Sequence, residues 1–244
     1  MSRHLVSDES ILDDSARIAC KALAKSMLSQ GFYLAGGTGL AIQLKHRISL
    51  DLDFFTLRPS ERLDLNFISS TLEKAVPRNE LSLVTSQIDQ SVWTIGTTKV
   101  SFVAYPFSLL DEPLDGSLIS GSSAGLRVAA VRDIACMKAY ALGRRAAFRD
   151  YVDLYFILRS TAITLDSLVR DCERKFVLGS QRVFSTKLFL EQLVYTEDIQ
   201  DRDAALRLLP KQDDTTAESV CRFLREAVDH YVQRELGDTG GGRS

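Results

Sequence analysis

The pattern of apolar positions predicts an N-terminal half in which helices alternate with strands. Apolar residues recur at helical spacing over residues 11–28, and a second helix is expected at residues 38–46. A third helix, with Ser60 as its N-cap, is expected to run to about Ala75. Short apolar or alternating runs predict strands at residues 32–35, 50–55, 81–85, 91–95 and 99–105.

Beyond this half the pattern becomes helical. Residues 106–125 are rich in Pro, Gly and Ser, which we interpret as a linker. Helical periodicity then recurs at residues 127–143, 148–159, 164–176, 185–196 and 216–235. The glycine-rich tail is typical of disorder. The sequence therefore predicts an α/β (α+β) protein with a mixed-sheet domain at 1–125, a helical domain at 126–236 and a disordered tail at 237–244.

The charge balance limits the ways in which the chain could bind nucleic acid. It has 30 Lys and Arg residues against 32 Asp and Glu residues, a formal net charge of -2. Proteins that bind nucleic acid through overall charge are usually basic, so a nucleic-acid partner would need a local basic patch. The arginines that could form one are Arg127, Arg132, Arg144, Arg145 and Arg149.

Composition also bears on location. No apolar run approaches the roughly 20 residues of a membrane span, and the polar N-terminus lacks the apolar core of a signal peptide. The four cysteines form no CxxC pair, so neither a zinc site nor a disulfide framework is indicated. We therefore expect a cytoplasmic protein without a membrane partner and with reduced thiols.

The residues that suggest chemistry are Gly36-Gly37-Thr38 and Asp51-Leu52-Asp53. A strand that passes through Gly-Gly into a helix presents backbone N–H groups that bind anions, and the Thr38 hydroxyl adds a donor. Side chains alternate along a strand, so Asp51 and Asp53 face the same way, where Mg²⁺ would offset their repulsion. Each motif alone is common. Their conjunction on strand, turn, helix and strand indicates phosphoryl or nucleotidyl transfer.

A second group of charged residues follows the linker. Lys138 lies on an apolar helix segment, and it shares a face with Arg145 if that helix continues far enough. Asp150 and Asp153 share a face of the next helix. Lys138 could hold a triphosphate while an aspartate orients it or Arg149, or acts on the acceptor hydroxyl. Alternatively, these residues form ion pairs that tie two helices together. Spacing alone does not decide between the two.

These motifs resemble those of the AbiEii/AbiGii nucleotidyltransferase toxin family. The resemblance covers the stretch Phe32–Ala41, the stretch His46–Phe55, and Lys138 with Arg149–Tyr155. It implies a polymerase-β-like nucleotidyltransferase domain followed by a helical domain. Members of the family are toxins of bacterial toxin–antitoxin or abortive-infection pairs, neutralised without a stable protein complex in the best-known cases. Some members add nucleotides to the 3′ end of tRNA.

The resemblance also implies roles for individual residues. Asp51 and Asp53 would bind Mg²⁺ or Mn²⁺, Lys138 would hold the triphosphate of the NTP, and Asp150 or Asp153 would be an accessory acid. The remaining nucleotide-binding residues would be Gly36, Gly37, Thr38, Arg47, Ser49 and Arg149. Many enzymes of the wider superfamily carry a third acid on a later strand. Here Ser101 stands at that position, which leaves the number of metal ions open.

Three functions remain open at this stage. The first is transfer of a nucleoside monophosphate to tRNA, which the arginine cluster favours. The second is transfer to a protein side chain or to a small molecule such as an aminoglycoside, which the neutral overall charge fits equally well. The third is nucleotide binding without catalysis, consistent with the missing third acid. The NTP preference, the oligomeric state and the identity of a neighbouring antitoxin do not follow from the sequence.

Overall fold

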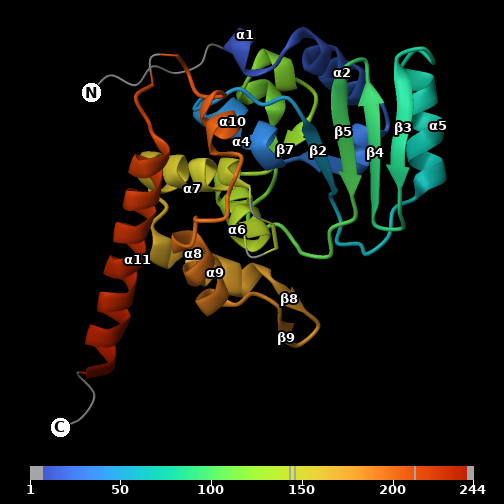
Figure 1. Cartoon of the computed structure of the whole chain (residues 1–244). Helices are drawn as coiled ribbons and strands as arrows, with labels where there is room; N and C mark the ends of the chain where they lie inside the picture. Colours follow the sequence, from blue (N-terminus) through green and yellow to red (C-terminus); the bar gives the residue numbers. More distant parts are fainter. Residues whose placement is uncertain (1–7, 143, 146, 212, 241–244) are drawn as a thin grey trace. The chain divides into compact units, whose positions relative to one another are not determined.

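The computed structural model describes residues 8–142, 144–145, 147–211 and 213–240. Contacts between Cα atoms divide the chain into two compact units, Met1–Ile134 and Ala135–Ser244. Figure 1 shows the helices and strands of both. No described helix is both long and apolar enough to cross a membrane.

The first unit alternates helices and strands. Its helices are α1 (Asp8–Ile11), α2 (Asp14–Ala24), α3 (Leu28–Gly31), α4 (Gly36–Leu44), α5 (Leu65–Ala75) and the first residues of α6 (Val131–Leu142). Its strands are β1 (Phe32–Leu34), β2 (Leu52–Thr56), β3 (Leu81–Ser86), β4 (Gln90–Ile95), β5 (Thr98–Val103), β6 (Leu114–Asp115) and β7 (Arg127–Val128). Two short 3₁₀ turns, η1 (Gly116–Leu118) and η2 (Gly121–Ser123), lie between β6 and β7.

The seven strands form one mixed sheet in the order β3-β4-β5-β2-β1-β7-β6. Strand β2 runs parallel to β5 and antiparallel to β1, and β1 runs parallel to β7. Parallel neighbours require a crossover, which the segments between β2 and β5 supply with α5, β3 and β4. The α/β fold class with a mixed sheet is therefore confirmed.

One face of the sheet forms the hydrophobic core of this unit. Phe54 of β2 stacks on Phe102 of β5 with ring centroids 5.6 Å apart, and Phe32 of β1 meets Phe102 edge to face. Helices α2 and α5 contribute buried side chains to the same core, including Leu23 and Leu72. Alternation along the strands directs the intervening residues, including Asp53 of β2, to the opposite face.

Helix α5 begins later than the sequence pattern indicated. Its N-cap is Asp64, whose carboxylate accepts a hydrogen bond of 2.9 Å from the backbone N–H of Phe67. The predicted cap, Ser60, instead hydrogen-bonds Arg62 within a turn ahead of the helix. Both residue types are good caps, and the chain uses the one that directly precedes the helix.

The second unit is mainly helical. It contains α7 (Phe148–Ser160), α8 (Leu165–Lys175), α9 (Thr186–Val194), α10 (Arg202–Leu206), α11 (Ala217–Gly240) and most of α6. Tyr151 packs on Phe148 within α7, and its hydroxyl donates to the carbonyl of Gln192 in α9 over 2.8 Å. Helix α11 contacts α7, α8, α9 and α10. A buried core between these helices holds the unit together.

Two places differ from the expectation that the chain is helical after Gly125. Strand β7 pairs with β1, which keeps residues 127–128 in the sheet, and the division between the units falls inside α6. A short hairpin of β8 (Val177–Leu178) and β9 (Gln181–Arg182) turns at Gly179, whose φ is +60°. Of the tail predicted to be disordered, 237–240 belong to α11 and 241–244 lie outside the described residues.

Candidate active site

The turn between β1 and α4 brings the Asp53 carboxylate against Gly36. The backbone N–H of Ala35 donates to the carbonyl of Asp53 over 2.9 Å, which joins the end of β1 to β2. Gly36 has φ +61°, a conformation that side chains disfavour. A Cβ atom at this position would also lie only 2.5 Å from Asp53 Oδ2. Glycine is therefore required here for two reasons: the backbone conformation disfavours any side chain, and the Asp53 carboxylate occupies the space that a Cβ atom would need.

The second glycine of the turn makes room for Arg47. A Cβ atom at Gly37 would overlap Arg47 Nη2 and approach Ser49 Oγ to 3.3 Å. The Arg47 side chain is buried, with 2% of the residue exposed, and its Nη1 donates to the carbonyl of Ile48 over 2.9 Å. A buried guanidinium thus lies beside the first turn of α4. We call Gly36 and Gly37 the glycine turn.

Thr38 and Ser49 connect this turn to the aspartate segment. Thr38 Oγ1 lies 2.8 Å from Ser49 Oγ and also hydrogen-bonds the backbone carbonyl of Asp51. A hydroxyl carries one proton and a carbonyl can only accept, so Thr38 donates to Asp51 and accepts from Ser49. Both hydroxyl groups are buried. The Thr38 hydroxyl, expected at a phosphate, is therefore engaged within the protein and positions Asp51.

Asp51 and Asp53 lie at the start of β2. Asp51 is the residue before the strand, so the strand begins two residues later than the alternation predicted. Leu52 and Phe54 are buried in the core, whereas Asp51 and Asp53 are half-buried. This alternation directs both carboxylates away from the core. Among the described residues no group of three or more His, Cys, Asp or Glu side chains could hold a metal ion, and a metal-binding role for Asp51 and Asp53 stays a prediction.

The neighbouring strand places a hydroxyl where a third carboxylate was considered. In the parallel pairing of β2 with β5, Asp53 is the partner of Ser101. Residues paired in this way point to the same face of the sheet, and Ser101 is 3% exposed. The register thus puts Ser101 beside Asp53, and the described sheet offers a neutral oxygen at this position.

The second group of predicted residues forms a buried ionic cluster. Lys138 Nζ of α6 lies 2.6 Å from Asp150 Oδ1 and 2.6 Å from Asp153 Oδ2, both on α7. Both carboxylates are fully buried, and Lys138 is 4% exposed. Arg145 adds a bidentate contact to Asp150, with Nε 2.9 Å from Oδ2 and Nη2 3.1 Å from Oδ1. We call Lys138, Arg145, Asp150 and Asp153 the lysine cluster.

The electrostatics of the lysine cluster favour ionised carboxylates. Burial alone raises the pKa of Asp150, but the charges of Lys138 and Arg145 and their hydrogen bonds outweigh it and hold that pKa below its usual value. The carboxylate is therefore charged at neutral pH. Since one buried lysine faces two buried carboxylates, removing the lysine would leave both without their main counter-charge.

The geometry settles part of the choice that spacing left open. Asp150 and Asp153 do share a helix face, and the ion pairs with Lys138 do tie α6 to α7. Lys138 and Arg145 do not share a helix face, because α6 ends at Leu142. A role for Lys138 in holding a triphosphate, with its carboxylates as orienting groups, stays a prediction, as does the role of half-buried Arg149.

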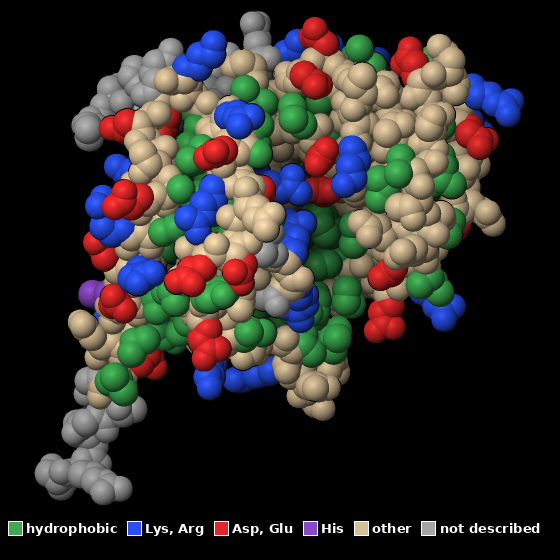
Figure 2. All heavy atoms as spheres, viewed as in Figure 1, with side chains coloured by type: hydrophobic (Ala, Val, Ile, Leu, Met, Phe, Trp, Pro, Cys, Tyr) green, Lys and Arg blue, Asp and Glu red, His purple; other side chains and the backbone are tan. Residues whose placement is uncertain are grey.

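The arginines expected to form a basic patch mostly have partners inside the protein. Arg127 donates to the carbonyl of Gln30, and Arg132 pairs with Asp111. Arg144 donates to the carbonyl of Tyr140 and lies 3.4 Å above its ring. Figure 2 shows Lys and Arg side chains interspersed with Asp and Glu over the visible face. The surface charge on this face is therefore mixed in sign (Figure 2).

Comparisons with solved structures support the fold. JHP933 from Helicobacter pylori matches at a TM-score of 0.52 and 17% identity, covering 93% of this chain and 99% of that chain. MenT4, a nucleotidyltransferase toxin from Mycobacterium tuberculosis, matches at a TM-score of 0.55 and 17% identity, covering 87% of this chain and 82% of that chain. At this level of identity the similarity concerns the fold, and it agrees with the expected polymerase-β-like architecture.

Comparisons of sequence are more specific. The uncharacterized protein aq_aa25 of Aquifex aeolicus is 30% identical over 222 residues, which cover 91% of this chain and 98% of that protein. The family model described as "Nucleotidyl transferase AbiEii toxin, Type IV TA system" matches residues 17–234, a span that includes the glycine turn, both aspartates and the lysine cluster. The chain therefore belongs to the AbiEii family of nucleotidyltransferase toxins.

Proposed function

We propose that this protein transfers a nucleoside monophosphate from an NTP to the 3′ end of a tRNA, with a divalent metal ion bound by Asp51 and Asp53. Membership of the family supplies the reaction type, an NTP substrate and a cognate antitoxin. The acceptor and the metal are the parts that we add. One observation carries the proposal: the Asp53 carboxylate and the Arg47 guanidinium lie against the two adjacent glycines of the glycine turn.

The residues of the glycine turn fit a triphosphate. The turn opens α4, whose N-cap residue Ala35 makes no side-chain hydrogen bond to the helix. The first N–H groups of a helix and its dipole favour an anion there, and the buried guanidinium of Arg47 adds a full positive charge. Because neither glycine carries a Cβ atom, the Asp53 carboxylate and the Arg47 guanidinium lie directly against this backbone, where a metal-bound phosphate would meet both.

The donor set fits a hard divalent cation. Asp51 and Asp53 offer half-exposed carboxylate oxygens on one face of the sheet, which Mg²⁺ or Mn²⁺ prefers and commonly shares with substrate phosphates. Such an ion supplies charge neutralisation at the phosphates. Thr38 and Ser49 fix the backbone of Asp51, so this chain's own residues hold the acidic oxygens in place.

The reaction requires an acceptor hydroxyl and releases pyrophosphate. The acceptor oxygen forms a bond to the α-phosphorus while the bond from that phosphorus to the bridging α–β oxygen breaks. The hydroxyl proton passes to a base, and in the proposal Asp51 or Asp53 is that base. A tRNA 3′ end offers such a hydroxyl, and its use by some members of the family supports this acceptor.

Transfer of label tests the proposal directly. Purified protein is incubated with each α-³²P-labelled NTP, Mg²⁺ and total tRNA, and RNA is then separated from protein on a gel. We expect label in tRNA and none in tRNA whose terminal diol has been oxidised with periodate, because that treatment destroys the 3′ hydroxyl. Label in the protein fraction, or only in an added aminoglycoside, would identify another acceptor. If the protein bound NTP but transferred label to no acceptor, its function would be nucleotide binding without catalysis.

The metal requirement is tested in the same assay. Chelation with EDTA should abolish labelling, and Mg²⁺ or Mn²⁺ should restore it in the wild type. Restoration should fail in Asp53→Asn, whose carboxylate is replaced by a neutral amide of similar shape. Equal labelling in EDTA and in Mg²⁺ would contradict the assignment of Asp51 and Asp53 as metal ligands.

A further inference from the structure

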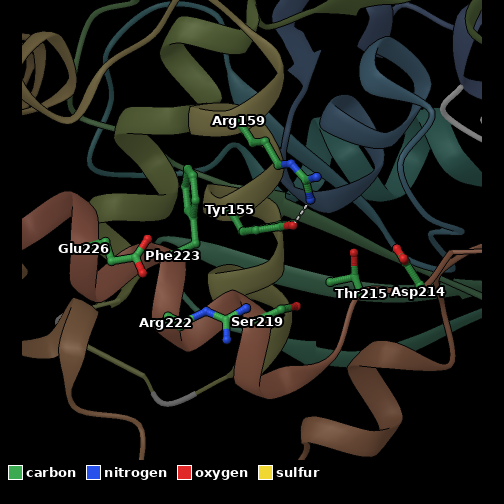
Figure 3. Close-up of a pocket in the computed structure, with 8 residues that line it drawn as sticks. All are labelled: Tyr155, Arg159, Asp214, Thr215, Ser219, Arg222, Phe223 and Glu226. Carbon is green, nitrogen blue, oxygen red and sulfur yellow. Dashed lines mark hydrogen bonds between the residues drawn. The ribbon is translucent and has the colours of Figure 1, made fainter. Parts of the chain in front are cut away.

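A polar pocket lies within the second unit and shares no lining residue with the lysine cluster. It has a volume of about 380 Å³ and is formed by the end of α7, the start of α11 and the segment that precedes α11 (Figure 3). Its lining residues are Tyr155, Arg159, Asp214, Thr215, Ser219, Arg222, Phe223 and Glu226. Tyr155 is the last residue of the Arg149–Tyr155 stretch that resembles the family, and neither the ion pairs nor the proposed reaction uses it.

Two arginines give the pocket its anion-binding character. Arg159 hydrogen-bonds the Tyr155 hydroxyl, and Figure 3 shows Arg159 on one side of this hydroxyl and Arg222 on the other. Arg222 is exposed, and it makes no hydrogen bond or ion pair with any residue that the structure describes. A guanidinium on either side of one hydroxyl suits a phosphate group, which accepts hydrogen bonds from both.

The other lining residues narrow the class of ligand. Asp214 and Glu226 balance the two arginines in charge, so a di- or triphosphate would meet two carboxylates as well as two cations. A phosphodiester carries one negative charge, and its sugar hydroxyls can donate to a carboxylate. Phe223 packs edge to face on Tyr155, with ring centroids 5.1 Å apart, and forms an apolar wall for the sugar or base. This combination fits a ribose phosphate.

We propose that this pocket binds one ribose-phosphate unit of the RNA acceptor, with the phosphate between Arg159 and Arg222 and a ribose hydroxyl donating to Asp214. The inference rests on the proposed function, because it assumes that the acceptor is RNA. It assigns to the helical unit a contact that fixes the position of the RNA and takes no part in the chemistry. The ribose hydroxyl would allow the pocket to distinguish RNA from DNA.

The test measures RNA binding without NTP, so that binding is separated from transfer. Fluorescence anisotropy of dye-labelled tRNA is recorded for wild type, Arg222→Ala and Arg225→Ala at several salt concentrations. Arg225 is the matched control, because it is an exposed arginine of the same helix but lines a different groove, between α9 and α11. Because Arg222 has no partner among the described residues, its removal should leave the melting temperature unchanged.

We expect Arg222→Ala to weaken tRNA binding about tenfold and to reduce the slope of log K against log salt by about one. Arg225→Ala should have a clearly smaller effect on both. Equal losses in the two variants would show a general charge effect and overturn the proposal, as would wild-type affinity in Arg222→Ala. A tRNA affinity independent of Arg222, together with Arg222-dependent binding of AMP, would assign the pocket to a free nucleotide and also overturn it.

The label-transfer assay, run in parallel on the wild type, separates this inference from the function. If the wild type transfers label to tRNA but RNA binding does not depend on Arg222, the RNA-binding role of the pocket is refuted and the proposed function stands. If the wild type does not bind RNA, the RNA-binding role of the pocket is also refuted. The transfer assay then shows independently whether RNA is an acceptor. DNA of the same sequence as the tRNA 3′ end should bind more weakly than the corresponding RNA, and equal binding would contradict the contact to a ribose hydroxyl.

Discussion

The glycine turn with its two aspartates and the lysine cluster both place carboxylates near cations, but they differ in what surrounds the charges. Asp51 and Asp53 are half-buried at the start of a strand. Asp150 and Asp153 are fully buried, and Lys138 and Arg145 already neutralise them. In the glycine turn, one charged side chain also lies close to the backbone of each glycine, because neither glycine has a Cβ atom.

This difference separates two uses of ionised residues. Buried and mutually compensated charges fix the arrangement of helices, and their contribution to the stability of the fold is small or negative relative to apolar residues. Half-exposed carboxylates on a sheet face can exchange water for a metal ion at little cost in folding. The predictions below test this distinction, beginning with the largest effect.

The largest effect is expected on transfer, from Asp53→Asn. Replacing the carboxylate should lower the transfer rate at least about a hundredfold, because the proposed metal ligand and a charge beside the glycine turn are both lost. The melting temperature should change little, because the residue is half-buried and the amide keeps its shape. Initial rates of label transfer and a thermal melt measure the two quantities.

Asp89→Asn is the matched control for this variant. Asp89 is exposed, follows β3 of the same sheet, and loses the same charge on substitution. Its rate should stay within about twofold of the wild type, since surface substitutions of this kind are usually near neutral. If both variants lost activity equally, the effect of Asp53→Asn would reflect overall charge and not a local role.

The second effect concerns stability. Lys138→Ala should lower the free energy of unfolding by about 3–5 kcal/mol, because Asp150 and Asp153 would lose the buried cation that contacts both, and Arg145 would remain beside Asp150. Urea unfolding without nucleotide measures the loss. Mg²⁺-NTP should raise the melting temperature of the wild type. If it raises the melting temperature of the folded variant equally, Lys138 does not contact the triphosphate.

A neutral replacement of the cluster separates its two roles. The triple variant Lys138→Met, Asp150→Asn, Asp153→Asn removes every charge of the two Lys138 pairs and leaves only the half-exposed Arg145 charged, and it should recover much of the stability that Lys138→Ala loses. If this variant also transfers nucleotides at the wild-type rate, the lysine cluster is structural only. If it is stable and inactive, Lys138 or its carboxylates contribute to the reaction.

The third effect compares two glycines. Gly36→Ala and Gly179→Ala both force alanine into the left-handed region, at a cost of about 1–2 kcal/mol each. Only Gly36 has a carboxylate where the new Cβ atom would lie, whereas Gly179 has open space around it. Gly36→Ala should therefore destabilise the fold by an additional 1–3 kcal/mol or so, and it should also impair transfer. Equal costs in urea unfolding would show that Asp53 moves aside freely.

The smallest effect is a pH dependence. Because the folded-state pKa of Asp150 lies below its usual value, its stabilisation is fully present above the unfolded-state pKa of about 3.9 and is lost as pH falls through the folded-state pKa. The difference in unfolding free energy between the wild type and Asp150→Asn should therefore be constant from neutral pH to about pH 5 and shrink below about pH 4. A difference that grows with acid would contradict the direction of the shift.

Local patterns predicted much of this molecule. Helices α7 and α8 lie within about a residue of the predicted spans, because apolar periodicity is strong there and Thr164 caps α8. The resemblance to the wider superfamily pointed to Ser101 as the position of a third acid, and the register of β2 with β5 pairs Ser101 with Asp53. Contacts between residues close in the sequence, or between regular strands, can therefore be predicted from sequence patterns.

Contacts between segments distant in the sequence could not be predicted in this way. Nothing in the sequence indicated that β7 would join the sheet, because two residues are too few to show a period. The expectation of one basic patch was weakened for a similar reason: the partners of Arg127 and Arg132 lie 97 and 21 residues away along the chain. The pocket of Arg159 and Arg222 joins segments that only the packing of α7 and α11 brings together.

The close approach at the glycine turn has a genetic consequence. Every missense change at a glycine codon adds a side chain, and at Gly36 or Gly37 its Cβ atom would be placed where Asp53 or Arg47 lies. If expression of the chain arrests bacterial growth, spontaneous survivors should carry missense changes at these two codons more often than at the codon of Gly179. Sequencing the survivors would map the tightest part of the site without a single purified variant.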